Sequence, residues 1–302
     1  MICSILLYNL VTAAYIEKQN NYAAMLLDIS KNQFNSGFVS EIDAVDETTY
    51  RSIIGLWNLK STEDLNDVFQ FIFPNGYNVA DAINGAVILA TLNVNVDEWN
   101  LLIQGFNTQP EVISLSDDKF ADIDDDHGHL ASSITMESLH RLSKVDVPPH
   151  SLVLKVNDIC FLTHSISKKE KLAKNSRIRI VSISRYMIRV CTLEANPTYH
   201  SIPRVRFRFK LPYHASFYML RTQFPLRLAY AMTIDKSQGQ SMNKVIIDIR
   251  NSSFSHGQSY VAFSRVRDAN NVLIYCQSNQ KDESCLYISN VVYPMLCNIP
   301  FS

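Results

Sequence analysis

Three short, mostly apolar runs constrain the fold of this 302-residue chain more than any other feature. They occupy residues 85–90, 244–249 and 272–276. Runs of this length without regular polar alternation are typical of strands buried on both faces of a parallel sheet. The first run is followed by a turn over residues 91–95 and by helical spacing of apolar residues over 96–103. This order of strand, turn and helix predicts an α/β fold built on a parallel sheet.

Further elements are expected around these runs. Helical spacing or length predicts helices over residues 22–29, 65–73 and 259–264, the second of which should stop at Pro74-Asn75-Gly76. Asn35-Ser36-Gly37 predicts a turn. We expect a single strand over residues 227–232, followed by a loop or helix start at 236–240.

The pattern changes between about residues 150 and 210. Five short segments there show alternation or enrichment in β-branched residues, and they cover residues 152–156, 158–162, 177–183, 187–192 and 205–209. Five strands in a row without helices predict a small β-barrel inserted into, or preceding, the next α/β section.

The net charge of −1 hides a strong asymmetry between the two halves of the chain. Residues 1–145 hold 7 Lys/Arg against 20 Asp/Glu, whereas residues 146–302 hold 21 Lys/Arg against 9 Asp/Glu. Such asymmetry favours a polyanionic partner for the basic half. The alternative is that the two halves dock on each other.

One basic segment has the period of a strand. The alternation in Arg204-Val205-Arg206-Phe207-Arg208-Phe209-Lys210 places cations on one face and apolar side chains on the other. We interpret Arg204, Arg206 and Arg208 as lining a groove that contacts nucleic-acid phosphates. The alternative is an ordinary solvated edge strand.

An acidic run precedes this basic half. It contains Asp117, Asp118, Asp122, Asp124, Asp125 and Asp126, followed by His127 and His129. Carboxylates and imidazoles are good metal ligands, but the run lacks the ligand spacing and central glycine of a calcium loop. We therefore interpret it as a solvated acidic loop and predict no metal site.

The cysteines and the apolar termini exclude other classes of protein. The six cysteines are scattered without a Cys-x-x-Cys pair, which argues against a zinc site and a secreted disulfide framework and favours a reducing compartment. Residues 1–15 are apolar but lack a basic start and are too short to span a bilayer. We expect no membrane partner.

Two constellations carry residues suited to phosphate chemistry. Thr233-Ile234-Asp235-Lys236-Ser237-Gln238-Gly239-Gln240 follows a predicted strand, where parallel sheets bind ligands, and combines hydroxyls, an amide, a cation and a glycine. His256-Gly257-Gln258-Ser259-Tyr260-Val261-Ala262-Phe263-Ser264-Arg265 places an arginine at the end of a short helix, where it could stabilise charge on a phosphoryl group. Alone, the first is also compatible with a polar turn and the second with a surface arginine.

Together, these constellations and the intervening Val245-Ile246-Ile247-Asp248 resemble the petite-integration-frequency (Pif-type) DNA helicases of superfamily one, including the helicase part of Helitron transposons. The resemblance covers most of residues 20–280 and is strongest at 221–276. It implies a RecA-like parallel sheet, the second helicase motor domain, over residues 81–302, with the barrel inserted at about 150–210. Residues 1–80 would be a remnant of, or lead-in from, the first motor domain.

The resemblance also implies roles for individual residues. Thr233, Lys236, Ser237 and Gln238 fall on the motif that contacts the DNA backbone, and Gly239 and Gln240 lie toward its nucleotide side. Gln258, Tyr260, Ser264 and Arg265 fall on the next motif, whose arginine reaches the γ-phosphate. The complete protein would unwind DNA 5′ to 3′ with ATP and Mg²⁺, act on single-stranded DNA or DNA junctions, and serve repair, recombination or telomere maintenance in the nucleus (alternatively the mitochondrion).

The sequence departs from the family pattern at the ATP site. It contains no Gly-x-x-x-x-Gly-Lys-Ser/Thr and no good strand ending in an Asp-Glu pair, since Asp46-Glu47 follows only Asp43-Ala44-Val45. Asn9-Leu10-Val11 stands where the family has Asn-Met-Arg, and Lys174-Asn175-Ser176-Arg177 where it has Asn-Gly-Thr-Arg. We expect Met1 to begin near the end of the first motor domain, and ATP and Mg²⁺ to bind only with that domain complete.

Two other functions remain open at this point. The chain could be a stand-alone module that binds single-stranded nucleic acid through its basic half. It could also be a transposon-derived fragment without a function of its own.

Overall fold

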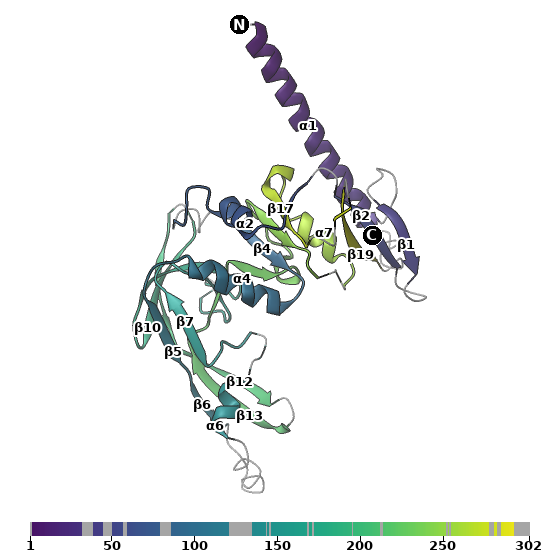
Figure 1. The fold of residues 1–302 in the computed structure, drawn as a ribbon. Coiled ribbons are helices and arrows are strands. Elements are labelled where there is room, and N and C mark those ends of the chain that lie inside the picture. Colours follow the sequence, from purple (N-terminus) through teal and green to yellow (C-terminus); the bar gives the residue numbers. More distant parts are fainter. Residues whose placement is uncertain are drawn as a thin grey trace. The chain divides into compact units, whose positions relative to one another are not determined.

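The computed structural model divides into two compact units, Met1–Trp99 with Tyr230–Ser302 (the first unit) and Asn100–Ala229 (the second unit). It describes the backbone of residues 2–31, 39–44, 50–56, 59–78, 86–120, 135–142, 144, 146–167, 169–170, 172–194, 196–211, 214–251, 253, 255–277, 281–282 and 285–292. Figure 1 shows its helices and strands along the chain.

A five-stranded parallel sheet is the centre of the first unit. Its order is β15-β4-β16-β17-β3, formed by Ala231–Thr233, Val87–Ala90, Val245–Asp248, Val272–Tyr275 and Lys60–Thr62. All residues of β4 and β16 are buried, which explains why the sequence runs there show no polar alternation. The predicted α/β class with a parallel sheet is confirmed, and the edge strand β3 is an addition.

The next three helices lie close to the predicted segments, and one of them begins at a side-chain cap. In α2, Leu65–Ile72, the Asp64 carboxylate accepts a hydrogen bond from the Asn66 backbone N–H at 2.8 Å, and Gly76, with φ of 82°, lies in the turn beyond the helix. The helix α4, Asn93–Gly105, begins three residues before the predicted stripe. The helix α7, Gln258–Phe263, matches the predicted one within a residue at each end.

The first unit also holds a long helix and an antiparallel sheet. The helix α1 spans Ile2–Lys31, so the segment predicted as helical is its last part. The sheet has the order β1-β2-β19-β18, from Val39–Ala44, Tyr50–Gly55, Cys285–Val292 and Lys281–Asp282. The turn predicted at Asn35-Ser36-Gly37 lies outside the described residues.

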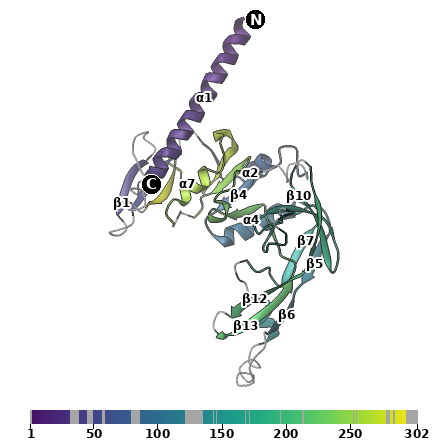
Figure 2. The same ribbon diagram turned by 180° about the vertical axis from the view of Figure 1, so that it is seen from behind.

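The second unit consists mainly of antiparallel strands. Its five-stranded sheet has the order β11-β10-β9-β8-β14, formed by Tyr199–Pro203, Met187–Thr192, Arg177–Ile183, Ile159–Leu162 and Leu226–Leu228. Two smaller sheets pair β5 (Glu111–Leu115) with β7 (Ser151–Lys155), and β12 (Val205–Leu211) with β13 (His214–Gln223) and β6 (Asp117–Phe120). A short helix, α6, covers Met136–His140. Figure 2 shows β12, β13 and β6 side by side.

Two findings correct or complete the sequence prediction here. The single strand expected over residues 227–232 is wrong: β14 ends at Leu228 and β15 begins at Ala231, and the two strands belong to different sheets. Asn175, which stands at the glycine position of the family pattern that the sequence resembles, has φ of 68°. Asparagine is the side chain that tolerates this left-handed conformation best, so the departure preserves the turn before β9.

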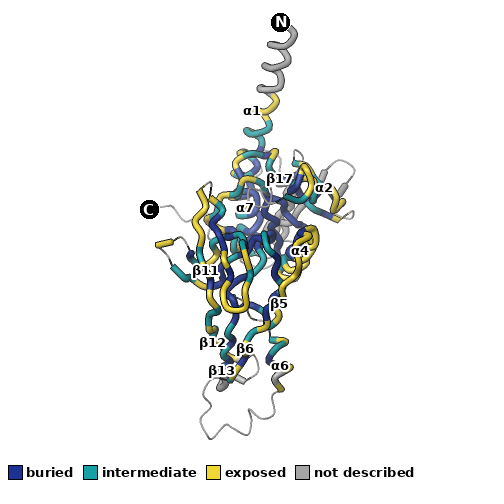
Figure 3. Tube along the Cα trace, turned by 90° about the vertical axis from the view of Figure 1, so that its left-hand side faces the viewer, coloured by how far each residue is buried: buried dark blue, intermediate teal, exposed yellow. Residues whose placement is uncertain are grey.

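The strands of the second unit differ in how far they are buried. In the second unit, residues of β7, β8, β9, β10 and β14 form one buried cluster, whereas β5 is mostly exposed (Figure 3). Over the described part of the chain, none of the helices has both the length and the apolar character needed to cross a bilayer.

Candidate nucleotide and nucleic-acid site

The loop after β15 closes on itself at the carboxyl end of the parallel sheet. A short 3-10 turn, η2, covers Asp235–Ser237, and the buried Ser237 hydroxyl donates to the Ile234 carbonyl at 2.6 Å. The Gln240 backbone N–H donates to the Ser237 carbonyl at 3.0 Å, and its side-chain amide donates to the Lys236 carbonyl at 2.9 Å. Gly239 has φ of 77°, a conformation that favours glycine. The loop is thus a defined turn.

Arg265, just after α7, is bonded directly to this loop. Its Nη1 donates to the carbonyls of Ser237 and Gln240, both at 3.1 Å, and these two residues bracket Gln238 and Gly239. Its Nε donates to the Val261 carbonyl at 2.8 Å and its Nη2 to the Ser264 hydroxyl at 2.8 Å. The two predicted constellations therefore meet through one guanidinium, which is half-buried.

Two more contacts fix α7. The Gln258 amide donates to the Asp235 carboxylate at 3.5 Å, at the limit of a hydrogen bond, and Gln258 is 1% exposed. The Tyr22 hydroxyl of α1 donates to the Phe263 carbonyl at 2.5 Å, and burial raises the pKa of this phenol, which keeps it a donor. The helix that precedes Arg265 is held by contacts with both α1 and η2.

The predicted site residues differ in exposure. Gln238, Gly239 and Tyr260 are exposed, and Lys236, Gln240 and Arg265 are half-buried. Thr233, Ser237 and Gln258 are buried, so their side chains do not face solvent in this conformation. The structure brings the loop after β15 and the segment of α7 and Arg265 together. Some of their predicted site residues are accessible to solvent, and the others are buried and support the loop and the helix.

The basic strand β12 has the predicted alternation. Arg206, Arg208 and Lys210 are exposed, and Phe209 is buried against Leu139, Val147 and Met219. Arg208 and Lys210 lie over the Tyr218 ring, with 4.2 and 5.6 Å to its centroid. Cations beside an aromatic ring form a surface suited to phosphates and stacked bases.

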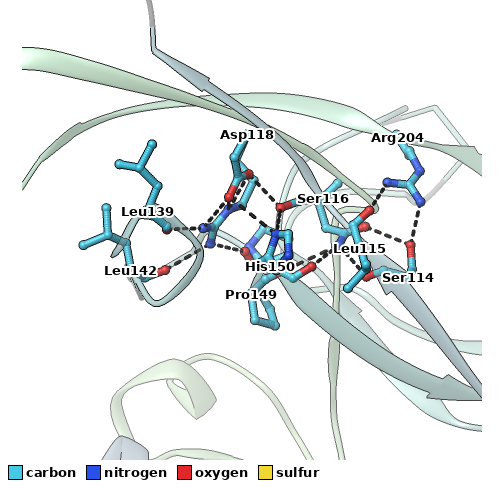
Figure 4. Close-up of polar contacts among 12 residues, drawn as sticks. Ser114, Leu115, Ser116, Asp118, Leu139, Leu142, Pro149, His150 and Arg204 are labelled. Atoms are coloured by element: carbon cyan, nitrogen blue, oxygen red, sulfur yellow. Dashed lines mark hydrogen bonds and ion pairs between the residues drawn. The ribbon is translucent and has the colours of Figure 1, made fainter. Parts of the chain in front are cut away.

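Arg204 behaves differently from the other two predicted arginines. It is half-buried, with Nη1 bonded to the Leu115 carbonyl at 2.6 Å and Nη2 to the Ser114 hydroxyl at 2.8 Å (Figure 4). Its guanidinium also lies 4.8 Å from the centre of the Phe224 ring. These contacts give Arg204 a role in packing within the second unit.

A polar cluster at the end of β16 was missed. The buried Asp248 carboxylate accepts from the Trp99 indole N–H at 2.7 Å and from Arg250 Nη2 at 2.8 Å, and Arg250 Nη2 also donates to Glu98 at 3.0 Å. The hydrogen bond that Arg250 donates to Asp248 is the main cause that raises the pKa of Arg250. The sequence signal for this cluster was the acid Asp248 at the end of the apolar run Val245-Ile246-Ile247. Polar groups gather at the carboxyl ends of the strands in parallel sheets.

The acidic run also needs a correction. Asp118 is not part of a solvated loop: it lies in β6, is 5% exposed and pairs with the fully buried Arg221 at 3.0 Å. Asp117, its neighbour, is exposed and pairs with Lys119 at 3.0 Å. Asp122, Asp124, Asp125, Asp126, His127 and His129 lie outside the described residues.

Comparison with known proteins shows which class of protein contains a similar segment. Residues 220–299, which include the loop after β15 and the helix before Arg265, match the Herpes_Helicase family model, described as "Helicase". The chain therefore contains a helicase region.

Curated relatives narrow the class to a family. The ATP-dependent DNA helicase Pif1 of Campylobacter jejuni is 46% identical over 71 residues, which are 24% of this chain and 15% of that protein. The ATP-dependent DNA helicase PIF1 of Xenopus laevis is 32% identical over 147 residues, 43% of this chain and 22% of that protein. The matched residues of this chain are a Pif1-family helicase region.

A solved structure shares the fold. The Pif1 helicase from Candida albicans aligns with a TM-score of 0.50 and 18% identity, over 70% of this chain and 49% of that one. The aligned part thus spans about half of the solved protein, and the regions matched in the two curated relatives span less than a quarter of each. The narrower likeness to Helitron helicases stays a prediction.

Proposed function

We propose that this chain supplies the second motor domain of an ATP-dependent, 5′-to-3′ DNA helicase. In this proposal residues 81–302 are RecA-like, the antiparallel strands of about 150–210 are the inserted barrel, and residues 1–80 lead in from the first motor domain. The parallel sheet and the family membership support it, and the two curated relatives above carry the name ATP-dependent DNA helicase.

The observation that carries the proposal is the position of Arg265. Its guanidinium bonds the loop at Ser237 and Gln240, so the two motifs face one another as a sensor of phosphate and DNA requires. We assign to Arg265 the contact with the phosphoryl group that is transferred. Nucleotide binding is assigned to Gln258, Tyr260, Gly239 and Gln240.

The donor set of this loop fits a nucleotide's phosphates. Arg265 and Lys236 are cationic, and Gln238 and Gly239 offer an amide and an exposed backbone N–H group, all of which suit phosphate oxygens. ATP would supply the free energy, with its phosphates and Mg²⁺ held mainly by a first motor domain. This chain would orient the terminal phosphate and stabilise its charge.

We assign the DNA contacts to Lys236 and Gln238 in the loop and to Arg206 and Arg208 on β12. Thr233 and Ser237 would stabilise the loop from its buried side, because their side chains are buried. Arg204 would position β12 through Ser114 and Leu115. Single-stranded DNA or a DNA junction is the expected partner.

A salt titration tests the DNA contacts. Binding of a fluorescent oligo(dT) to the full chain is followed by anisotropy at several salt concentrations, for the chain and for Arg206→Ser/Arg208→Ser. Each lost phosphate contact on a single strand lowers the slope of log K against log salt by about 0.7, so the double variant should lose about 1.4. The matched control, Lys119→Ser/Arg141→Ser, removes the same charge from exposed pairs with Asp117 and Glu137 and should keep the slope. Equal slopes in both variants would sink the assignment of β12.

The nucleotide side has a separate test. An arginine without a phosphate-binding loop has nothing to act on, so the 302-residue chain should hydrolyse ATP no faster than a blank. DNA-stimulated hydrolysis that is lost in Arg265→Ala would overturn this. A transcript that continues upstream of Met1 into a Gly-x-x-x-x-Gly-Lys-Ser/Thr motif would support the helicase over a stand-alone binding module.

A further inference from the structure

Three side chains with metal-binding chemistry meet in the second unit, whereas the loop and helix of the helicase motifs belong to the first unit. Asp118 lies on β6, His140 is the last residue of α6, and His150 directly precedes β7. One ligand atom from each lies within 4.8 Å of the other two. The segments that carry them are separated in sequence, so the cluster is a product of folding.

The carboxylate is already oriented. Asp118 is buried, and its oxygens accept from Arg221 Nε and Nη2 at 3.0 Å and from the Ser116 hydroxyl at 2.6 Å. The Ser116 hydroxyl also lies 2.8 Å from His150 Nδ1 (Figure 4). Outer partners of this kind fix the direction of a ligand before a metal arrives.

The spacing of one pair of ligand atoms, from Asp118 and His150, is close to that of a zinc site. With ligand bonds of about 2.0–2.1 Å, two ligands of a tetrahedral zinc ion lie about 3.3 Å apart. His150 Nδ1 is 3.6 Å from an Asp118 oxygen, and the rings of His140 and His150 are stacked with 3.6 Å between their centroids. The stacked planes differ by 9°, so both rings must rotate before a nitrogen of each points at a shared ion, and both side chains are only half-buried.

We propose that Asp118, His140 and His150 bind a zinc-class divalent cation. Two imidazole nitrogens and one carboxylate oxygen are a ligand set that such ions accept, with water in the fourth position. Arg221 keeps its bonds to the carboxylate as an outer partner, and its positive charge weakens the site relative to one without it. The ion joins α6 and the segment before β7 to β6, which makes it a structural clamp.

The clamp makes the stability of the full chain depend on the metal. After treatment with EDTA, the chain is titrated with Zn²⁺ while its thermal midpoint is measured, and with Co²⁺ while its visible absorption is recorded. We expect the midpoint to rise with Zn²⁺ concentration by mass action and Co²⁺ to give the bands of a four-coordinate site. No change in either measurement would overturn the proposal.

Variants locate the site. His140→Ala and His150→Ala should each weaken Zn²⁺ binding at least about tenfold, the lower end of what loss of an outer partner alone causes. His164→Ala removes an exposed imidazole of the same unit, and His127→Ala/His129→Ala removes the two histidines of the acidic run; both should bind as the unchanged chain does. Binding that survives His140→Ala but is lost in His127→Ala/His129→Ala would place the ion elsewhere and refute the assignment. Melting in EDTA shows that each variant is folded, and none of these measurements depends on helicase activity.

Discussion

Arg221 offers the sharpest test of the second unit. Its side chain is fully buried in β13 and donates to both oxygens of Asp118, to the Leu139 carbonyl at 2.9 Å and to the Leu142 carbonyl at 3.0 Å. A further bond reaches the Pro148 carbonyl at 3.2 Å. One guanidinium therefore joins β13, β6, α6 and the segment between α6 and β7.

The expected cost of Arg221→Met follows from these contacts. Removing one partner of a buried ion pair costs about 3–5 kcal/mol, because a carboxylate is left buried without its counter-charge. The carbonyls that lose their donors add to this, although the segment near Leu142 can shift and reach water. We expect a loss of about 4 kcal/mol or more, a large part of the 5–15 kcal/mol that stabilises a typical domain.

Urea unfolding in EDTA measures this loss. The double variant Arg221→Met/Asp118→Leu should cost clearly less than the sum of the two single variants, because it leaves no unpaired charge. Arg141→Met is the matched control, since Arg141 is exposed and pairs only with Glu137 among the described contacts, and it should unfold as the unchanged chain does. A loss below about 1 kcal/mol for Arg221→Met, or purely additive costs, would refute the assigned network.

Three further predictions concern the first unit. Trp99→Phe should lower the unfolding free energy in urea by about 1.5–3 kcal/mol, because the Asp248 carboxylate loses a charge-assisted bond; no change would mean that this bond is absent in solution. Arg265→Lys should speed hydrogen exchange of the Gln240 and Met242 amides about fivefold, as expected for a local loss of about 1 kcal/mol, with β16 unchanged. Burial lowers the pKa of His256 below its ordinary 6.5, so the unfolded chain gains a proton first as the pH falls. Its contribution to stability should be complete above pH 6.5 and decline as the pH falls toward the folded pKa, and His256→Gln should flatten that part of the pH profile.

The parallel sheet could be predicted because burial on both faces leaves a direct mark. The runs at β4, β16 and β17 are almost wholly apolar, and each is a strand of the sheet. The same rule failed at residues 227–232. Ala229 and Tyr230 are also buried, so nothing in the run marks the point where the chain leaves one sheet for another.

The second unit was less predictable because its strands depend on distant polar partners. β13 contains Arg221 at a fully buried position, and its partner Asp118 is 103 residues away in a run of acids. A single sequence gives no sign of that pairing, so Asp118 was interpreted as solvated and β6 and β13 were missed. Only once the pairing is seen does the burial of both charges make physical sense.

The candidate site illustrates how far the sequence leads. The resemblance to Pif-type helicases, rather than the residue types alone, predicted that the loop after β15 and the helix before Arg265 act together, and the guanidinium does lie at that loop. The sequence did not predict that the partners of this guanidinium are backbone carbonyls, since any loop sequence offers carbonyls. The burial of Ser237 could not be predicted either, because its hydroxyl turns back to the Ile234 carbonyl.

This choice of partners makes Arg265 suited to couple a phosphate to the loop. A phosphate is anionic and can accept two parallel bonds from a guanidinium, whereas the carbonyls of Ser237 and Gln240 are neutral, so in the proposed function a phosphate would replace these carbonyls as partners of Arg265. Once released, those carbonyls no longer hold the turn that carries Gln238. The Nε bond to Val261 lies within the helix segment and can stay, which keeps the arginine aimed while its other end exchanges partners. Arg265→Lys, which keeps the charge but cannot bridge both carbonyls, should therefore loosen the loop even without any nucleotide.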